Sequence, residues 1–127
     1  MSFSLLLVDD SNVARRYVRK ELLSLLNYEE IVVTEGSNGK EACAACHAYK
    51  VDLLMLDLTM PEMTGYDVLE HFKKNAMAIK AIVLSADIQP GVEERVKGLG
   101  AIGYLKKPFN REQMVKVLKE NGFHVKN

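Results

Sequence analysis

Leu53-Leu-Met-Leu-Asp57 is a short apolar run that ends in a carboxylate, and the chain contains four other runs of the same kind. Each is shorter than the roughly 8–20 residues of a typical helix, and several are rich in β-branched residues, which favours strands. Their apolar residues are continuous rather than alternating, so the strands are predicted to be covered on both faces. The other four runs are Leu5–Val8, Ile31–Val33, Ile82–Leu84 and Ile102–Leu105.

Amphipathic stretches with helical spacing separate these runs. After Ser11, for example, Ala14, Val18, Leu22 and Leu25 share one helix face. Strands that alternate with helices imply a parallel sheet, because each strand is re-entered from the same end through a crossover helix. We therefore predict an α/β, doubly wound fold with a five-stranded parallel sheet and helices on both faces. Helix starts and ends are signalled by Ser11, Asn110, Gly100 and Gly122.

Length and composition place limits on what the chain can be. Its 127 residues predict a single domain over residues 1–127, in which 122–127 form a short C-terminal tail. Lys plus Arg equals Asp plus Glu at 17 each, so nothing favours a nucleic acid as partner. The apolar runs are far shorter than the ~20 residues of a membrane span. Residues 1–8 lack the basic start of a signal peptide, so a cytoplasmic location is expected.

Cys43-Ala-Ala-Cys46-His47 formally matches the attachment motif of c-type haem. The motif lies within a helical pattern in which Ala42, Cys46 and Tyr49 share a face. Two packed thiols are the favoured interpretation, because a free cysteine usually behaves as a small apolar side chain. A redox or metal role for Cys43 and Cys46 is left open.

Polar residues follow the predicted strands at their carboxyl ends, where open parallel sheets bind ligands. Asp9 and Asp10 follow the first run, Asp57 the third and Ser85 the fourth, and the fifth leads into Lys106 and Lys107. Taken singly these residues are ordinary: aspartates cap helices, a serine ends a strand, and lysines are solvated. Together they form an acidic cluster that suits Mg²⁺, a carboxylate that can accept a phosphoryl group, and a lysine that can balance charge.

Four segments carry a resemblance to a known family. They are Leu7-Val-Asp-Asp-Ser11, Asp57-Leu-Thr-Met-Pro-Glu-Met-Thr-Gly65, Ser85-Ala-Asp87 and Tyr104-Leu-Lys-Lys-Pro-Phe109. Over its whole length the chain resembles a response-regulator receiver domain of the single-domain, CheY-like type. The resemblance implies the strand order 2-1-3-4-5 of the flavodoxin-like folds, for which CheY is itself a standard example.

The resemblance also implies the roles of the acidic residues. Asp57 would accept the phosphoryl group, and Asp10 would bind Mg²⁺ together with Asp57 and the backbone carbonyl of Thr59. Asp9 would hold a metal-bound water or assist as a second acid. Lys107, rather than Lys106, matches the family's lysine, because it directly precedes Pro108, and the Lys107–Pro108 bond would be cis.

The same resemblance implies a switch. Ser85 and Tyr104 occupy the switch positions, and Thr59 and Asp87 occupy positions that tune the lifetime of the phosphate. A histidine kinase would supply the phosphoryl group. Phosphorylation would repack the surface formed by the fourth helix, fifth strand and fifth helix for a target or a phosphatase.

The resulting hypothesis is a stand-alone, monomeric response regulator in chemotaxis or related signalling, with no enzymatic activity beyond its own phosphorylation and dephosphorylation. One alternative is an interaction module that is never phosphorylated. Another is a Mg²⁺-dependent phosphohydrolase, but its nucleophile motif needs a second Asp where Thr59 stands. A transcription factor is disfavoured because no helix-turn-helix segment follows residue 121.

Overall fold

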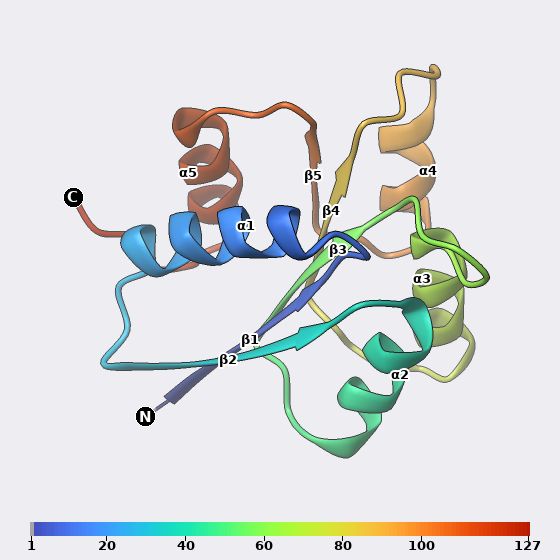
Figure 1. Ribbon diagram of the computed structural model, residues 1–127, viewed down its shortest axis with the longest axis horizontal. Coiled ribbons are helices and arrows are strands. Elements are labelled where there is room, and N and C mark those ends of the chain that lie inside the picture. Colours follow the sequence, from blue (N-terminus) through green and yellow to red (C-terminus); the bar gives the residue numbers. More distant parts are fainter. Residues whose placement is uncertain (1) are drawn as a thin grey trace.

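The computed structural model describes residues 2–127, in which strands and helices alternate from end to end (Figure 1). The strands are β1 (Ser2–Val8), β2 (Glu30–Gly36), β3 (Leu53–Asp57), β4 (Ala81–Ser85) and β5 (Gly103–Lys106). The helices are α1 (Asn12–Leu25), α2 (Gly39–Ala48), α3 (Gly65–Lys74), α4 (Val92–Gly98) and α5 (Arg111–Glu120).

The five strands form one parallel sheet in the order β2-β1-β3-β4-β5. The predicted fold class, its helices on both faces and its strand order are therefore confirmed. From β1 the chain goes first to β2 on one side and later to β3 on the other, so the strand order reverses between β1 and β3. The carboxyl ends of these two strands flank the crevice in which such folds bind ligands.

Two apolar cores cover the sheet, one on each face. Alternate residues of β3 point to opposite sides: Leu54 and Leu56 belong to one core, and Leu53 and Met55 to the other. Helices α2, α3 and α4 pack against the first face, whereas α1 and α5 pack against the second (Figure 1). Every residue of β3 is buried, as its continuous apolar sequence predicted.

Local signals in the sequence fix where the helices begin and end. The side chains of Ser11 and Asn110 accept hydrogen bonds from the first turns of α1 and α5, as predicted. Gly100 and Gly122 follow α4 and α5 with φ values of 104° and 81°, in the left-handed region that glycine tolerates best. The structure adds a reciprocal capping box at the start of α3, made by Thr64 and its partner three residues later.

The C-terminal residues are better anchored than the sequence suggested. Phe123 is buried in the core beneath α1 and α5. Val125 forms an antiparallel bridge with Leu26, and the backbone N–H of Lys126 donates to the carbonyl of Leu25 at 2.8 Å. The tail predicted over 122–127 is thus held against the end of α1.

Cys43 and Cys46 are free thiols in the core under α2, each only 8% exposed. Burial raises the pKa of both thiols, and the neighbouring Cys43 adds to the effect at Cys46, whose pKa rises to about 11. Buried, protonated thiols agree with the packing interpretation of the Cys-x-x-Cys-His motif.

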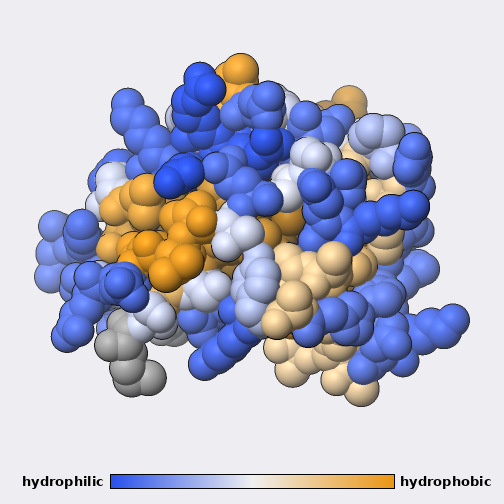
Figure 2. All heavy atoms as spheres, turned by 60° about the horizontal axis from the view of Figure 1, so that its bottom comes forward, coloured by the Kyte–Doolittle hydropathy of each residue, from blue (hydrophilic) through white to orange (hydrophobic). Residues whose placement is uncertain are grey.

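Hydrophilic residues cover much of the face that Figure 2 shows. Figure 2 brings forward the side on which α2 and β2 lie, and apolar areas interrupt the charged surface in the left and right halves of the view. Among large apolar side chains, Val32 of the edge strand β2 is 48% exposed and Tyr49, just after α2, is 40% exposed. Within residues 2–127, every helix is too short or too polar to cross a membrane.

Candidate functional site at the carboxyl edge of the sheet

The residues predicted for the site come together at one edge of the sheet. Asp9 and Asp10 directly follow β1, Asp57 is the last residue of β3, and Ser85 is the last residue of β4. Lys107 directly follows β5. Each of these residues leaves the sheet at its carboxyl edge because all five strands run in the same direction.

Lys107 joins two of the carboxylates. Its Nζ lies 3.1 Å from Oδ2 of Asp9 and 3.1 Å from Oδ1 of Asp57. The side chains of Asp9 and Asp57 are only 7% and 8% exposed, and that of Lys107 is 27% exposed. The Lys107–Pro108 peptide bond is cis, as the resemblance implied. The neighbouring Lys106 is exposed on β5, so of the two lysines it is Lys107 that reaches the carboxylates.

The backbone around Asp9 is fixed on three sides. Its Oδ1 accepts a hydrogen bond from the N–H of Ser11 at 2.9 Å, and its own N–H donates to the carbonyl of Gly36 at 3.2 Å. The guanidinium of Arg15 donates to the Asp9 carbonyl and also pairs with Glu35 at 3.0 Å. These contacts hold the carboxylate of Asp9 in one position beside Lys107.

The three aspartates form a group that could hold a cation. One carboxylate oxygen from each of Asp9, Asp10 and Asp57 lies within 4.8 Å of the others, and Asp10 is exposed to solvent while the other two are buried. Clustered carboxylate oxygens with an open side suit Mg²⁺, which keeps several waters and binds few protein ligands. Thr59 lies exposed in the loop after β3, two residues beyond Asp57, and its carbonyl remains a predicted fourth ligand.

The electrostatics of Asp57 follow from this crowding. Burial, followed by the charges of Asp9 and Asp10, raises the pKa of Asp57 from 3.8 to about 6, although Lys107 opposes the shift. Burial alone would lower the pKa of Lys107, but the two carboxylates beside it raise the pKa overall. A single ammonium thus faces more negative charge than it neutralises, and this favours the binding of a cation.

The two residues predicted as a switch are neighbours. Ser85 is fully buried, and its hydroxyl accepts a hydrogen bond from the N–H of Asp87 at 3.0 Å. Tyr104 is half-buried on β5, where burial raises the pKa of its phenol and a hydrogen bond with the Ser85 side chain works against that rise. The carboxylate of Asp87 accepts from the N–H of Gln89 at 2.9 Å, which keeps it within its loop.

Arg15 is the contributor that the sequence did not identify. Its side chain is only 12% exposed because it bridges Asp9 and Glu35. One signal was available: a cation in the first turn of a helix opposes the helix dipole, so such a residue often has a specific partner.

Gly65 is a second contributor, at the start of α3. A Cβ at this position would lie 2.8 Å from both the carbonyl oxygen of Asp57 and the Cα of Leu58. The N–H of Gly65 also donates to the Leu58 carbonyl at 2.8 Å. The glycine therefore lets α3 begin directly against the strand end that carries Asp57.

Comparisons with known proteins agree with this geometry. The sequence model of the response regulator receiver domain matches residues 5–119. The chain is 32% identical over 121 residues to the "Probable transcriptional regulator ycf29" of Porphyra purpurea, a match that covers 94% of this chain and 56% of that protein. It is 31% identical over 113 residues to the cell cycle response regulator CtrA of Brucella ovis, covering 87% of this chain and 46% of that protein. The chain thus spans about half the length of the curated relatives it matches.

A solved structure gives a match of more equal length. The chemotaxis protein CheY4 of Vibrio cholerae superposes with a TM-score of 0.76 at 28% identity, covering 94% of this chain and 98% of that one. A DNA-binding response regulator of the LuxR family from Staphylococcus aureus superposes with a TM-score of 0.78, also at 28% identity, over 93% and 97% of the two chains.

Proposed function

The chain belongs to the response regulator receiver domain family, and from this premise we propose that it accepts a phosphoryl group from a histidine kinase on Asp57. The observation that carries the proposal is the position of Lys107, whose ammonium lies 3.1 Å from both Asp57 and Asp9 in a buried site. Phosphoryl transfer depends mainly on positioning and on positive charge around the moving group. A fixed ammonium beside a carboxylate nucleophile meets both needs.

The transfer itself requires little of the protein beyond Asp57. A carboxylate oxygen of Asp57 donates an electron pair to phosphorus, the bond from phosphorus to the donor atom breaks, and the donor atom keeps the bonding pair. Because the pKa of Asp57 is about 6, the carboxylate is mostly ionised at neutral pH and therefore nucleophilic. Lys107 then balances the charge on the phosphoryl oxygens.

Mg²⁺ is the proposed cofactor. Asp9, Asp10 and Asp57 would hold it together with the backbone carbonyl of Thr59, with Asp10 and Asp57 as direct ligands and Asp9 acting through a water. The ion would neutralise charge on the phosphoryl group. The chemistry of the donor set supports the assignment, since all four groups offer the hard oxygen atoms that Mg²⁺ prefers.

Phosphorylation would act on the protein through Ser85 and Tyr104. The phosphoryl group attracts the Ser85 hydroxyl, and Tyr104 then turns inward toward the space that Ser85 leaves. The two packings differ in population before and after phosphorylation, and the group at Asp57 shifts the balance between them. Thr59 and Asp87, which stand two residues beyond Asp57 and Ser85 respectively, would tune how fast water removes the phosphoryl group.

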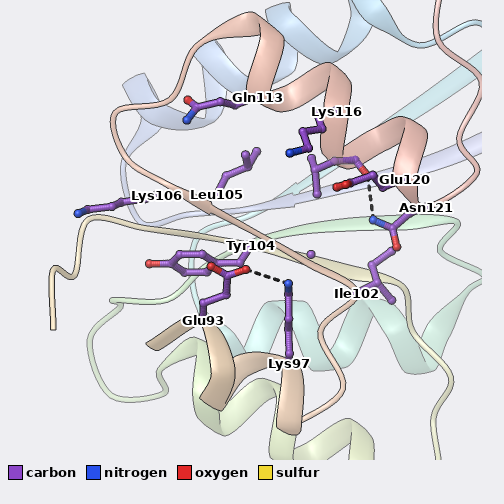
Figure 3. Close-up of a pocket in the computed structure, with 12 residues that line it drawn as sticks. Glu93, Lys97, Ile102, Tyr104, Leu105, Lys106, Gln113, Lys116, Glu120 and Asn121 are labelled. Carbon is purple, nitrogen blue, oxygen red and sulfur yellow. Dashed lines mark hydrogen bonds and ion pairs between the residues drawn. The ribbon is translucent and has the colours of Figure 1, made fainter. Parts of the chain in front are cut away.

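The proposed output face is a groove of about 570 Å³ between α4, β5 and α5. Tyr104 lies in it beside Glu93 and Lys97 of α4, which form an ion pair at 2.8 Å (Figure 3). Lysines and glutamates line much of the groove, so a partner with a mixed charge pattern would fit it. A downstream target or a phosphatase would bind here, and chemotaxis or related signalling in the cytoplasm is the proposed setting for a monomeric regulator.

Intact mass spectrometry after incubation with acetyl phosphate tests the proposal. Wild type should gain one phosphoryl group with Mg²⁺ and none with EDTA, and Asp57→Asn should gain none. Asp52→Asn is the matched control, because Asp52 precedes the same strand at its opposite end. If acetyl phosphate and a panel of histidine kinases all leave the wild type unmodified, the chain is instead an interaction module that works without phosphorylation.

A further inference from the structure

Two histidines from different helices meet on the side of the molecule away from the carboxyl edge. His47 lies in the last turn of α2, and its Nε2 is 2.8 Å from Nε2 of His71 on α3. The two rings are 5.1 Å apart between centroids and nearly perpendicular, at 84°. His47 is exposed and His71 is half-exposed, so solvent reaches the pair.

We infer that His47 and His71 form a binding site for a divalent late transition metal, such as Zn²⁺, that links α2 to α3. Imidazole nitrogens are preferred ligands of Zn²⁺, Cu²⁺ and Ni²⁺, and the site presents two of them from converging directions. The short contact requires a lone pair on at least one of the two nitrogens and a proton on the other. When the metal takes the place of that proton, the proton moves to Nδ1 of its own ring, so that each Nε2 presents a lone pair to the ion.

The distance is close to what such an ion needs. With Zn–N bonds of about 2.0–2.1 Å, two ligands of a tetrahedral ion are about 3.3 Å apart. The Nε2 atoms must therefore separate by about half an ångström from their 2.8 Å contact. Exposed side chains at the helix surface can make this movement by small rotations. Water would complete the coordination shell on the open side.

The surroundings neither block the pair nor compete with it. The ammonium of Lys73, two residues after His71, is directed toward the carbonyl of Gly98 at 3.4 Å, across on α4. Asn75 lies on the other side of the His71 ring, with its amide 3.5 Å from Nδ1 and donating to the His71 carbonyl at 2.8 Å. A His71 ring that binds the ion through Nε2 carries its proton on Nδ1, so the Asn75 side chain would turn its amide oxygen toward that N–H.

The cysteines of the same helix are not part of the proposed site. Cys43 and Cys46 are buried in the core, and burial raises the pKa of Cys46 to about 11, so the thiols stay protonated. Among residues 2–127, the only group of three or more potential ligands close enough to hold one ion is Asp9, Asp10 and Asp57. The proposed site therefore has two protein ligands and resembles an open surface chelate rather than a structural zinc site.

The histidine site and the acidic site are separate and differ in chemistry. His71 lies six residues after Gly65, or about 9 Å along the helix from the end that contacts Asp57. Oxygen ligands at the carboxyl edge suit Mg²⁺, and nitrogen ligands between α2 and α3 suit Zn²⁺. Binding at one site can thus be measured while the other is saturated.

Calorimetric titration of the full chain with ZnCl₂, in excess Mg²⁺, tests the inference. Wild type should bind one Zn²⁺. His47→Gln and His71→Gln should each bind it at least about tenfold more weakly. Once one histidine holds the ion, the other binds it within the same molecule, and each variant loses this chelate effect. His124→Gln is the matched control, since His124 lies beside Tyr28 in the C-terminal segment, and it should bind Zn²⁺ like the wild type.

Imidazole signals in NMR spectra give a second readout that does not depend on how well the variants fold. On addition of Zn²⁺ to the wild type, the signals of His47 and His71 should shift together while those of His124 stay in place. Equal affinity of the wild type, His47→Gln and His71→Gln would overturn the inference, as would a loss of binding in His124→Gln. Absence of Zn²⁺ binding by the wild type in excess Mg²⁺ would equally overturn it.

Discussion

Asp52 and Asp57 stand at the two ends of the same strand and have opposite environments. Asp52 precedes β3, where its Oδ2 accepts a hydrogen bond from the N–H of Ser4 at 2.7 Å and its Oδ1 lies 3.6 Å from an exposed lysine, Lys50. Asp57 ends β3 in a buried site that it shares with Asp9 and Lys107. The carboxylate of Asp52 accepts a hydrogen bond that links the start of β3 to β1. The carboxylate of Asp57 is buried and lies close to the negative charge of Asp9.

The difference arises from strand direction rather than from residue type. At the carboxyl edge, the ends of β1 and β3 diverge to α helices on opposite faces, and this opens the crevice that Asp9, Asp10 and Asp57 share. At the amino edge, Asp52 serves the backbone of the adjacent strand β1. Only at the carboxyl edge do several carboxylates lie close enough together to bind one cation.

The largest expected effect concerns the two lysines after β5. Lys107→Ala should slow phosphoryl transfer from acetyl phosphate about 100-fold or more, because it removes the positive charge beside Asp57. Lys106→Ala should react at a rate close to that of the wild type, since Lys106 is exposed. Intact mass measured over time gives both rates. Equal rates in the two variants would show that transfer does not depend on the ammonium of Lys107.

Asn substitutions at Asp57 and Asp52 should have smaller effects, which differ in sign, on the free energy of unfolding of the metal-free protein. The pKa of Asp57 is raised from 3.8 to about 6, so the folded state holds its proton more tightly than the unfolded chain does. The stability that protonated Asp57 contributes is present below about pH 4 and is lost as the pH rises through 6. Asp57→Asn should therefore raise the free energy of unfolding by on the order of 2 kcal/mol at pH 7.5, and by much less at pH 4.

Asp52→Asn should change the free energy of unfolding in the opposite direction. It weakens the hydrogen bond that the carboxylate accepts from Ser4 and should lower the free energy of unfolding by about 0.5–1 kcal/mol at pH 7.5. Urea unfolding in EDTA at the two pH values measures both variants. If Asp57→Asn destabilises the protein at pH 7.5 as Asp52→Asn does, then burial and the neighbouring carboxylates disfavour the charged form of Asp57 too weakly to affect stability.

The sequence predicted the strand ends better than it predicted the contacts made by helices. Asp9, Asp57, Ser85 and Lys107 could be expected at one edge because strand direction alone brings carboxyl ends together. Their proposed roles remain predictions. The strands themselves differ from the apolar runs by a few residues: β2 spans Glu30–Gly36, because backbone pairing with β1 continues past the apolar positions.

Contacts between helices depend on packing angles that sequence periodicity does not contain. The short approach of His47 to His71 requires α2 and α3 to lie side by side with two particular faces in contact. The bridge from Arg15 to Asp9 and Glu35 likewise depends on how α1 leaves the sheet beside β2. Helical periodicity identifies the buried face of a helix but not the neighbour that each exposed side chain meets.

A substitution at Gly65 tests how closely the carboxyl edge is packed. Gly65→Ala should lower the free energy of unfolding by about 1–3 kcal/mol, because its Cβ would lie 2.8 Å from backbone atoms of Asp57 and Leu58 that cannot easily move. Gly98→Ala, at the end of α4, should be neutral or stabilising by up to about 1 kcal/mol, since nothing lies within 4 Å of the added methyl group. The same substitution would thus change stability in opposite directions at a helix that begins against the site and at a helix end that faces open space.

Gly65→Ala should also slow phosphoryl transfer, because relieving the clash displaces the backbone that carries Asp57. Unfolding in urea and transfer measured by mass would report the two consequences separately. A Gly65→Ala variant as stable and as reactive as Gly98→Ala would show that the end of β3 can move without loss, and that the position of Asp57 is set by Lys107 and Asp9 rather than by the start of α3.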